Sequence, residues 1–344
     1  MSPKVLIIRF SSIGDVTQTL SAAYVLHQNG FEVHWAIRID LAPLVAFSPY
    51  VRRVWSLERR KGFLGLWDLA LKLRRENFTH IYDAHDSLRS RFLFVFLKYI
   101  PTRKNFFKKR YFLRRPLYRF RRWIWIQFKK NLLPTPKEAQ WQILEPLKVW
   151  GLNPVLPNKP VVHIDPNSLK IVEGELAKIQ LSQFIALCPG AAHPLKRWPI
   201  NYFKTIIQLN PKERFVILGG PFDTFADELV ATDPDRVFNY AGRLTLLESA
   251  AMIQKAKVVI TNDTGLMHLA EQLLKPTIAL IGPSLFGYPV RHTTTTHVLE
   301  NHLECRPCSR HGEGPCRNPI YQQCLQAILP QRVDQVLKNI LQTL

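Results

Sequence analysis

The sequence predicts an α/β protein built from two parallel sheets that face each other across a cleft. Residues 5–8 form a short continuous apolar run, which is typical of a strand buried on both faces of a parallel sheet. A polar turn at residues 11–15 and a helical pattern at residues 16–28 follow this run. Further apolar runs at residues 32–37 and 80–83 continue the series, and this alternation indicates βαβ units.

A second series of the same kind begins after a proline-rich connection. Residues 153–167 contain four prolines, a composition typical of a link between domains. Each later apolar run ends in a polar or glycine-containing turn, where open α/β sheets place their ligands. These runs are residues 184–188, 215–218, 258–260 and 277–281. We therefore expect an N-terminal domain at residues 1–163, a C-terminal domain at residues 164–325 and a terminal helix at residues 326–344.

The composition agrees with a globular protein that has an anionic partner. The chain has 344 residues, 47% of them hydrophobic, and a formal net charge of +21. Such a surplus predicts attraction to nucleic acid, an anionic membrane face or a phosphorylated substrate. The N-terminal apolar run is too short for the core of a signal peptide. We accordingly expect a cytoplasmic protein whose five cysteines are reduced or bound to metal.

The turn Asp263-Thr264-Gly265 is a candidate phosphate site. It follows the strand at residues 258–260, and a helical pattern begins directly after it. A helix N-terminus offers unpaired N–H groups and a partial positive charge, so it can hold a diphosphate. The alternatives are structural, because Asp263 or Thr264 can cap the helix and His268 can pack against the sheet.

Two other turns carry groups suited to transfer chemistry. Lys196 and Arg197 follow the strand at residues 184–188 and could neutralise a phosphate leaving group, or they could be solvated surface charges. Asp15 opens the helix after the first strand, where a carboxylate could act as a general base. Acidic residues also favour the first turn of a helix for structural reasons.

The four C-terminal cysteines have the spacing C-x₂-C-x₇-C-x₇-C. They are Cys305, Cys308, Cys316 and Cys324. Four thiolates can complete a tetrahedral zinc or iron site, and such a site would be structural because it has no open position. Buried reduced thiols or an adventitious disulfide are the alternatives. Cys188 stands alone and is expected to be a small core side chain.

Residues 98–130 are basic and rich in aromatic side chains, and no acidic residue lies between Asp86 and Glu138. This pattern suits single-stranded nucleic acid, or an interfacial helix on anionic lipid. The Trp-Ile-Trp-Ile run at residues 123–126 is flanked by cations and favours lipid. A solvated basic face over an aromatic core is the structural alternative. We expect no specific nucleic acid, because no RNP or helix-turn-helix signature is present.

Taken together, these motifs resemble glycosyltransferase family nine, the bacterial ADP-heptose:lipopolysaccharide heptosyltransferases. The matching blocks are residues 7–16, 188–191, 196–199, 216–221, 241–246 and 261–270. The resemblance implies a GT-B architecture of two Rossmann-like domains, the first binding the acceptor and the second the nucleotide-sugar. It also implies that the terminal helix can cross back to the first domain.

The resemblance further implies inverting transfer of a heptose from ADP-heptose to the lipopolysaccharide inner core, without a catalytic metal. Asp15 matches the proposed base, and Lys196 matches the residue that assists the diphosphate. Ser12 and Gly14 are assigned to the acceptor. The donor-binding assignment comprises Gly190, Arg197, Gly219, Gly220, Gly242, Asp263, Thr264, Gly265, Leu266, Met267 and His268. The expected acceptor carries lipid A and the inner core, and it is presented at the cytoplasmic face of the inner membrane.

The chain departs from the family pattern at two places. Many members carry an acidic residue near the position of Asn201 and a glutamate near the position of Phe225. Asp223 is the carboxylate nearest to the second place. These departures concern contacts with the ribose or the sugar. Another nucleotide-sugar, or a protein or polysaccharide acceptor, is therefore an alternative. A different class of function is a non-catalytic protein that binds nucleic acid or membrane on a GT-B scaffold.

Overall fold

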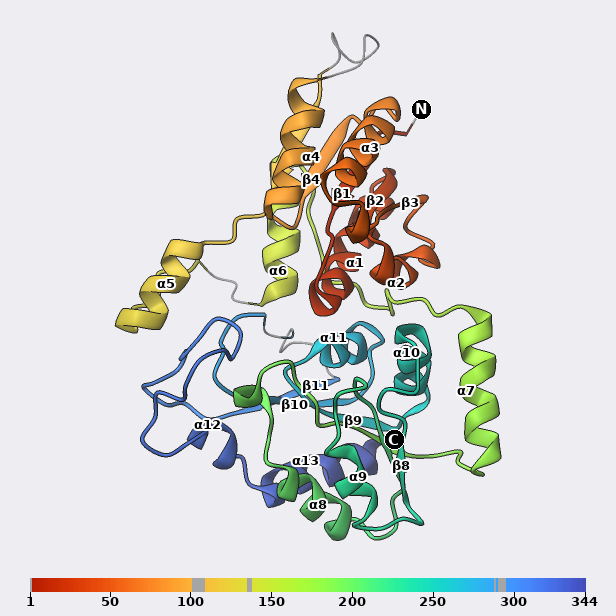
Figure 1. Cartoon of the computed structure of the whole chain (residues 1–344), viewed down its shortest axis with the longest axis vertical. Helices are drawn as coiled ribbons and strands as arrows, with labels where there is room; N and C mark the ends of the chain where they lie inside the picture. The colour runs from red at the N-terminus through yellow and green to blue at the C-terminus, as the bar shows by residue number, and fades with distance from the viewer. Residues whose placement is uncertain (1, 101–108, 135–137, 288, 290–294) are drawn as a thin grey trace. The chain divides into compact units, whose positions relative to one another are not determined.

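The computed structural model contains two compact α/β units (Figure 1), and it describes all residues except 1, 101–108, 135–137, 288 and 290–294. The first unit comprises residues 1–117 and 139–163, and the second comprises residues 118–138 and 164–344. The predicted domain limit at residue 163 coincides with a change of unit. Residues 118–138 depart from the expected boundaries, because they belong to the second unit.

The first unit has a five-stranded parallel sheet of order β3-β2-β1-β4-β5. Its strands are β1 (Lys4–Ile8), β2 (Glu32–Arg38), β3 (Arg53–Leu57), β4 (His80–Asp83) and β5 (Tyr111–Arg114). Its helices are α1 (Ile13–Gln28), α2 (Pro43–Ala46), α3 (Gly62–Arg75), α4 (Leu88–Tyr99) and α6 (Ala139–Leu144). Side chains alternate across a strand, so Leu6 and Ile8 of β1 face one side, where they pack with α3 and α4.

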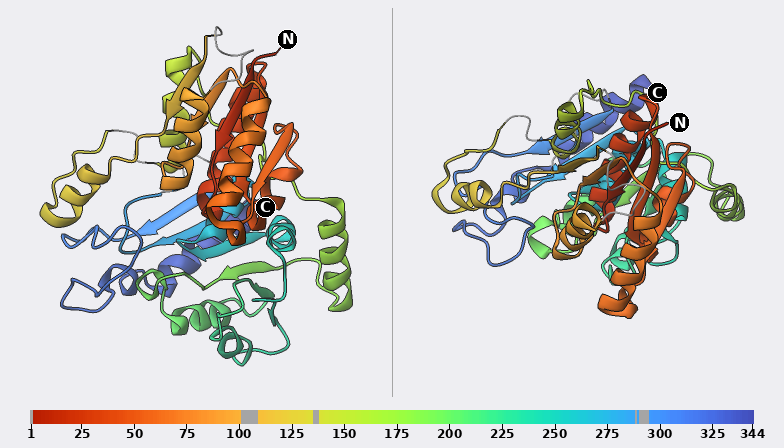
Figure 2. Two further views of the ribbon diagram at one scale, coloured as in Figure 1. Left: turned by 45° about the horizontal axis from the view of Figure 1, so that its top comes forward. Right: turned by 90° about the horizontal axis from the view of Figure 1, so that it is seen from above.

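The second unit has a six-stranded parallel sheet of order β11-β10-β9-β6-β7-β8. Its strands are β6 (Ile185–Cys188), β7 (Phe215–Ile217), β8 (Val237–Asn239), β9 (Val258–Asn262), β10 (Thr277–Ile281) and β11 (Thr296–Glu300). Its helices are α5 (Arg119–Phe128), α7 (Pro166–Lys178), α8 (Ile200–Leu209), α9 (Ala226–Val230), α10 (Leu246–Lys255), α11 (Gly265–Gln272), α12 (Gln323–Gln326) and α13 (Pro330–Thr343). Figure 2 shows the strands of this sheet from two further directions. The predicted α/β fold with two parallel sheets is confirmed.

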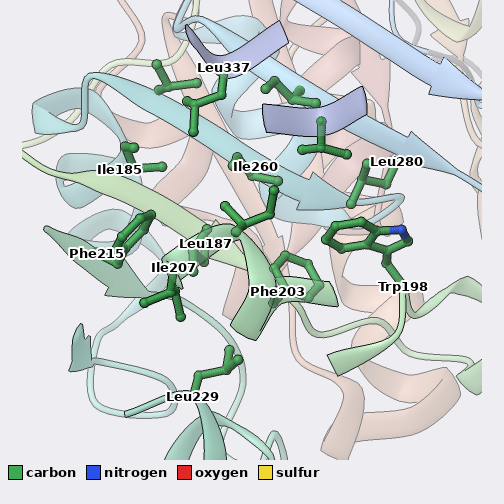
Figure 3. Packing of buried hydrophobic residues seen from close by; sticks show 14 of the residues in the cluster. Ile185, Leu187, Trp198, Phe203, Ile207, Phe215, Leu229, Ile260, Leu280 and Leu337 are labelled. Carbon is green, nitrogen blue, oxygen red and sulfur yellow. The ribbon is translucent and has the colours of Figure 1, made fainter. Parts of the chain in front are cut away.

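The core of the second unit explains the position of the C-terminal helix. Ile185 and Leu187 of β6 pack with α8 on one side of the sheet (Figure 3). Val333, Leu337 and Ile340 of α13, at helical spacing, join the same cluster. This stripe anchors α13 in the second unit, and the expectation that the helix crosses back to the first domain stays a prediction.

Among the described residues, no helix combines the length and the apolar character that crossing a bilayer requires.

Candidate functional site

The second sheet reverses its strand order between β6 and β9, which pair directly through Cys188 and Thr261. Ligands of open α/β sheets bind beyond the carboxyl ends of the strands at such a point. The turn at residues 189–199 follows β6, and the Asp263 turn follows β9. The topology therefore brings together two turns that are 60 or more residues apart in the chain.

Asn262 connects these two turns. Its side chain is fully buried, its Oδ1 accepts a hydrogen bond from the Trp198 backbone N at 3.0 Å, and its Nδ2 donates to the Pro189 carbonyl at 2.7 Å. Sequence reasoning did not assign this residue. Its signal was available, since a polar residue at the end of a buried strand requires a partner.

Lys196 and Asp263 form an ion pair within this arrangement. Lys196 Nζ lies 2.6 Å from Asp263 Oδ2, and their side chains are 14% and 11% exposed. Thr264 is the N-cap of α11, because its Oγ1 accepts a hydrogen bond from Leu266 N at 3.2 Å. The cap is thus supplied by Thr264, and the Asp263 carboxylate pairs with Lys196. A cation and the N-terminus of an eight-residue helix consequently lie beside one another.

Glycines from two strand ends approach Asp223 closely. A Cβ at Gly190 would lie 2.3 Å from Asp223 Oδ2, and a Cβ at Gly219 would lie 2.5 Å from the same atom. The carboxylate also accepts a hydrogen bond from Gly220 N at 2.8 Å. A Cβ at either glycine would therefore displace the Asp223 carboxylate, which lies at the carboxyl ends of β6 and β7. Gly242 has a φ of +72°, and its N–H donates to the Gly219 carbonyl at 3.0 Å.

The other predicted donor residues differ in what their side chains contact. Arg197 Nε donates to the Ala191 carbonyl at 3.0 Å, so this guanidinium stabilises its own turn. Met267 is buried in the core with Ala279, which leaves only its backbone for a ligand. His268 is 7% exposed, and its Nδ1 lies 3.3 Å from a carboxylate oxygen of the buried Glu271.

In the first unit, Asp15 lies between two buried arginines. Arg9 Nη2 is 2.5 Å from Asp15 Oδ2, and Arg115 Nη1 is 3.7 Å from Oδ1. Each arginine is 4% exposed, whereas the Asp15 side chain is 36% exposed. Ser12 Oγ donates to the same carboxylate at 2.9 Å and forms a capping box with it. Asp15 therefore has a structural role at the start of α1 and also presents a paired carboxylate to solvent.

Neither arginine was singled out from the sequence. Arg9 is the residue directly after β1, and Arg115 is the residue directly after β5. Both thus follow the carboxyl end of a parallel strand, which is the signal that could have found them. Arg9 also donates through Nη1 to the Ala84 carbonyl at 2.6 Å. Burial lowers the pKa of Arg9, an effect that its ion pair with Asp15 opposes.

His85 lies near this pair and is held in its neutral form. Its Nδ1 accepts a hydrogen bond from Phe10 N at 3.3 Å. Burial, and secondarily the charge of Arg9, lower the pKa of His85 to about 4.

Gly14 is buried directly before Asp15, while Ser12 is exposed. The predicted acceptor residues Ser12 and Gly14 therefore lie with Asp15 at the carboxyl end of β1.

The four C-terminal cysteines line a single cavity. The remaining lining residues are Leu195, Pro283, Asn318, Gln322 and Gln323. All four thiols are free, as is that of Cys188, which is buried in β6. Burial, with the neighbouring Cys305 thiol, raises the pKa of Cys308 to about 12. Within the described residues, no three His, Cys, Asp or Glu side chains are already arranged in a group that could hold a metal ion.

Helix α5 carries part of the basic aromatic segment, whose residues 101–108 lie outside the described residues. Its inner face packs within the second unit, where the Trp125 ring meets Phe286 edge-on at a centroid distance of 5.6 Å. Its outer face is aromatic. Phe120 is 70% exposed, Trp123 is 48% exposed and Phe128 is 61% exposed. The Phe120 and Trp123 rings are stacked at 5.9 Å, so they form one exposed patch.

Two parallel sheets of this strand order, with two polar turns at the switch point of the second sheet, are the architecture of the GT-B fold. Residues 147–315 match the profile of glycosyltransferase family 9 (heptosyltransferase). The chain belongs to this family, as the sequence motifs indicated. Lipooligosaccharide heptosyltransferase 2 of Haemophilus influenzae is 28% identical over 330 residues, which is 87% of each chain. Lipopolysaccharide heptosyltransferase 2 of Salmonella typhimurium is 31% identical over 192 residues, covering 50% of this chain and 53% of the relative.

Solved structures support the same fold over the whole chain. A glycosyl transferase of family 9 from Veillonella parvula has a TM-score of 0.78 at 18% identity and covers 99% of this chain and 98% of its own. The ADP-heptose lipopolysaccharide heptosyltransferase II of E. coli has a TM-score of 0.68 at 22% identity, and 99% of each chain is covered. The E. coli heptosyltransferase WaaC with ADP has a TM-score of 0.67 at 19% identity, with 98% of this chain and 99% of that chain covered.

Proposed function

We propose that this chain transfers a heptose from ADP-heptose to a hydroxyl group of the lipopolysaccharide inner core, with inversion at the anomeric carbon. The observation that carries the proposal is the Lys196–Asp263 pair beside the N-terminus of α11, at the switch point of the second sheet. The names of the related heptosyltransferases, and the ADP bound to one neighbour of the same fold, support this donor.

In the proposed reaction the second unit holds the donor diphosphate. The acceptor oxygen attacks the anomeric carbon on the side opposite the diphosphate, and the bond from that carbon to the diphosphate oxygen breaks. The leaving ADP gains negative charge, which Lys196 and the first N–H groups of α11 stabilise. Asp263 keeps the Lys196 ammonium in position until the donor binds.

In the same proposal the first unit supplies the base. Asp15 accepts the proton of the attacking hydroxyl group. Arg9 and Arg115 form ion pairs with this carboxylate at 2.5 Å and 3.7 Å. They also fix its position, since both guanidinium groups are buried. Arg9 and Arg115 are thus positioning residues for Asp15.

The test is transfer by the Asp15→Asn variant. With ADP-heptose and a heptose-free inner-core acceptor, we expect product formation, followed by mass spectrometry, to be lost. ADP affinity, measured by calorimetry, should be unchanged because the donor site is in the other unit. Asp40→Asn is the matched control, since this carboxylate is 53% exposed and pairs with Arg38 in the same unit. Transfer by Asp15→Asn at the control's rate would refute the assigned base.

A thermal-shift screen distinguishes the alternative donors. A nucleotide that binds the folded chain stabilises it by mass action. ADP and ADP-heptose should raise the unfolding temperature more than the corresponding UDP and GDP compounds at equal concentration. A larger rise of the unfolding temperature with UDP or GDP compounds would contradict ADP-heptose as the donor and would indicate another nucleotide-sugar.

We also propose that α5 binds the anionic membrane face where a lipid-linked acceptor is presented. Phe120, Trp123 and Phe128 would insert at headgroup depth, while Arg119 and Arg121 meet lipid phosphates. The charge pattern supports a lipid partner, because no acidic residue occurs between residues 86 and 138. The protein would then be a peripheral protein of the inner face of the cytoplasmic membrane.

Vesicle sedimentation tests this surface. Binding to phosphatidylglycerol vesicles should exceed binding to phosphatidylcholine vesicles and should weaken in the Phe120→Ser, Trp123→Ser double variant. Phe222→Ser is the control, because Phe222 is 91% exposed and lies elsewhere in the second unit. Undiminished binding by the double variant would contradict the assignment of this surface to α5.

A further inference from the structure

The cysteine cavity adjoins the turn that carries Lys196. Leu195 lines the cavity together with the four cysteines. Gly312, between the second and third cysteines, has a φ of +87°, and a Cβ there would lie 2.8 Å from Lys196 Cγ. The loop that contains the cysteines therefore packs directly on the Lys196 side chain.

Gln322 links a thiol to the Lys196 turn. Its backbone N–H donates to Cys316 Sγ at 3.3 Å, and its side-chain Nε2 donates to the Pro194 carbonyl at 2.7 Å. Asn318 Nδ2 donates in the same way to Cys305 Sγ at 3.6 Å. Two of the four sulfur atoms thus accept hydrogen bonds, and such hydrogen bonds commonly orient the ligands of a metal ion.

The same loop holds α5. Lys129, the residue directly after this helix, donates from Nζ to the Cys305 and Pro307 carbonyls, each at 2.9 Å. Arg317 Nη1 donates in turn to the Ile126 carbonyl at 3.3 Å. The cysteine loop is consequently the common support of the Lys196 turn and of the helix with the exposed aromatic patch.

We propose that Cys305, Cys308, Cys316 and Cys324 bind one zinc or iron ion, and that this ion fixes the loop that positions Lys196. Four thiolates form a tetrahedral site that zinc or iron can occupy. Each thiol can turn between staggered positions about its Cα–Cβ bond, so the donor atoms can gather when the ion binds. The ion has a structural role, because four thiolates leave no position for substrate.

The part of this inference that concerns Lys196 rests on the proposed donor site, whereas the metal site does not. An ion in the cavity would restrict the loop at four points along residues 305–324. Gln322 would then transmit this restraint to the backbone on both sides of Lys196, since its Nε2 also lies 3.5 Å from the Arg197 carbonyl. We expect the ion to be needed for tight binding of ADP.

Metal analysis of the purified full chain tests the site itself. We expect about one equivalent of zinc or iron per chain after purification in reductant without chelator. Cys308→Ser should lose it, and Cys188→Ser should keep it, because Cys188 lies in β6 and does not line the cavity. Metal-free wild-type protein that takes up neither Zn²⁺ nor Fe²⁺ would overturn the site, as would retention of the ion by Cys308→Ser.

ADP calorimetry tests the positioning role. Removal of the ion from the wild-type chain by a chelator should weaken ADP binding severalfold, and Zn²⁺ should restore it. Gln322→Ala should keep the ion and weaken ADP binding, a result that remains available if the cysteine variants fail to fold. Unchanged ADP affinity in both experiments would overturn the positioning role. Failure of the metal-loaded chain to bind ADP at all would instead contradict the proposed donor.

Discussion

Asn262 offers a direct test of how the candidate donor site is held together. The substitution Asn262→Ala removes two hydrogen bonds from a fully buried side chain. It leaves the Trp198 N–H and the Pro189 carbonyl without their partner, in residues that are themselves buried. An unpaired buried polar group costs about 1–3 kcal/mol. Two such groups would cost about 2–6 kcal/mol, and we expect a loss of roughly 2–4 kcal/mol in the free energy of unfolding, because Ala192 and Pro194 of the turn are exposed and the turn can relax toward water.

Urea unfolding at 25 °C, followed by circular dichroism, measures this loss. Hydrogen exchange of the peptide that contains residues 189–199 shows whether the loss is local to the turn. We expect faster exchange there and weaker ADP binding by calorimetry, because Lys196 lies within this turn. Asn201→Ala is the matched control, since Asn201 is exposed and its change should remain within about 0.5 kcal/mol.

The reasoning would be refuted by an Asn262→Ala variant whose stability and exchange equal those of Asn201→Ala. Loss of stability with unchanged exchange at residues 189–199 would also refute it. In that case the two hydrogen bonds would not be what holds the turns together.

Two further predictions concern charges in the two units. Burial lowers the pKa of His85 to about 4, against about 6.5 in the unfolded chain, so the unfolded state binds a proton first as pH falls. The neutral His85 ring therefore contributes to the free energy of unfolding. This contribution is complete above pH 6.5 and is lost between pH 6.5 and 4, by at most about 3 kcal/mol. His85→Gln, whose amide oxygen can accept from Phe10 N, should flatten the pH dependence of the urea midpoint over this range, and an unchanged slope would contradict the assignment. Arg306 and Glu300 form a buried pair at 3.0 Å, so Arg306→Met should cost about 3–5 kcal/mol in urea unfolding. The double variant with Glu300→Gln should regain part of that loss, and no recovery would show that the unpaired carboxylate is not its cause.

The central strands were predictable because they are buried on both faces. The runs that became β1, β6, β9 and β10 are continuous apolar segments, and each was expected close to its observed bounds. The edge strands β3, β5, β8 and β11 carry exposed or half-exposed side chains and have no such run. Their existence depends on a neighbouring strand that supplies hydrogen bonds, and local sequence does not reveal that neighbour.

The residues of the candidate site were partly predictable for the same reason. Asp15, Lys196 and Asp263 each follow a buried strand, where a polar turn at a sheet edge indicates a ligand site. Arg9, Arg115 and Asn262 were missed, because their importance comes from partners on other segments. Arg115 contacts a carboxylate 100 residues earlier in the chain, and Asn262 contacts a carbonyl 73 residues earlier.

The sequence by itself determined the α/β class, the two series of strands and the family, since these follow from local patterns and ordered motifs. The tertiary structure alone decided which segments support one another. Contacts with Phe286 and the Cys305 carbonyl place α5 in the second unit, and the apolar stripe of α13 is buried there too. Such contacts join residues far apart in the chain, so no short stretch of sequence contains both partners. The four cysteines were visible as a spacing, and only the folded chain shows that they share one cavity against the Lys196 turn.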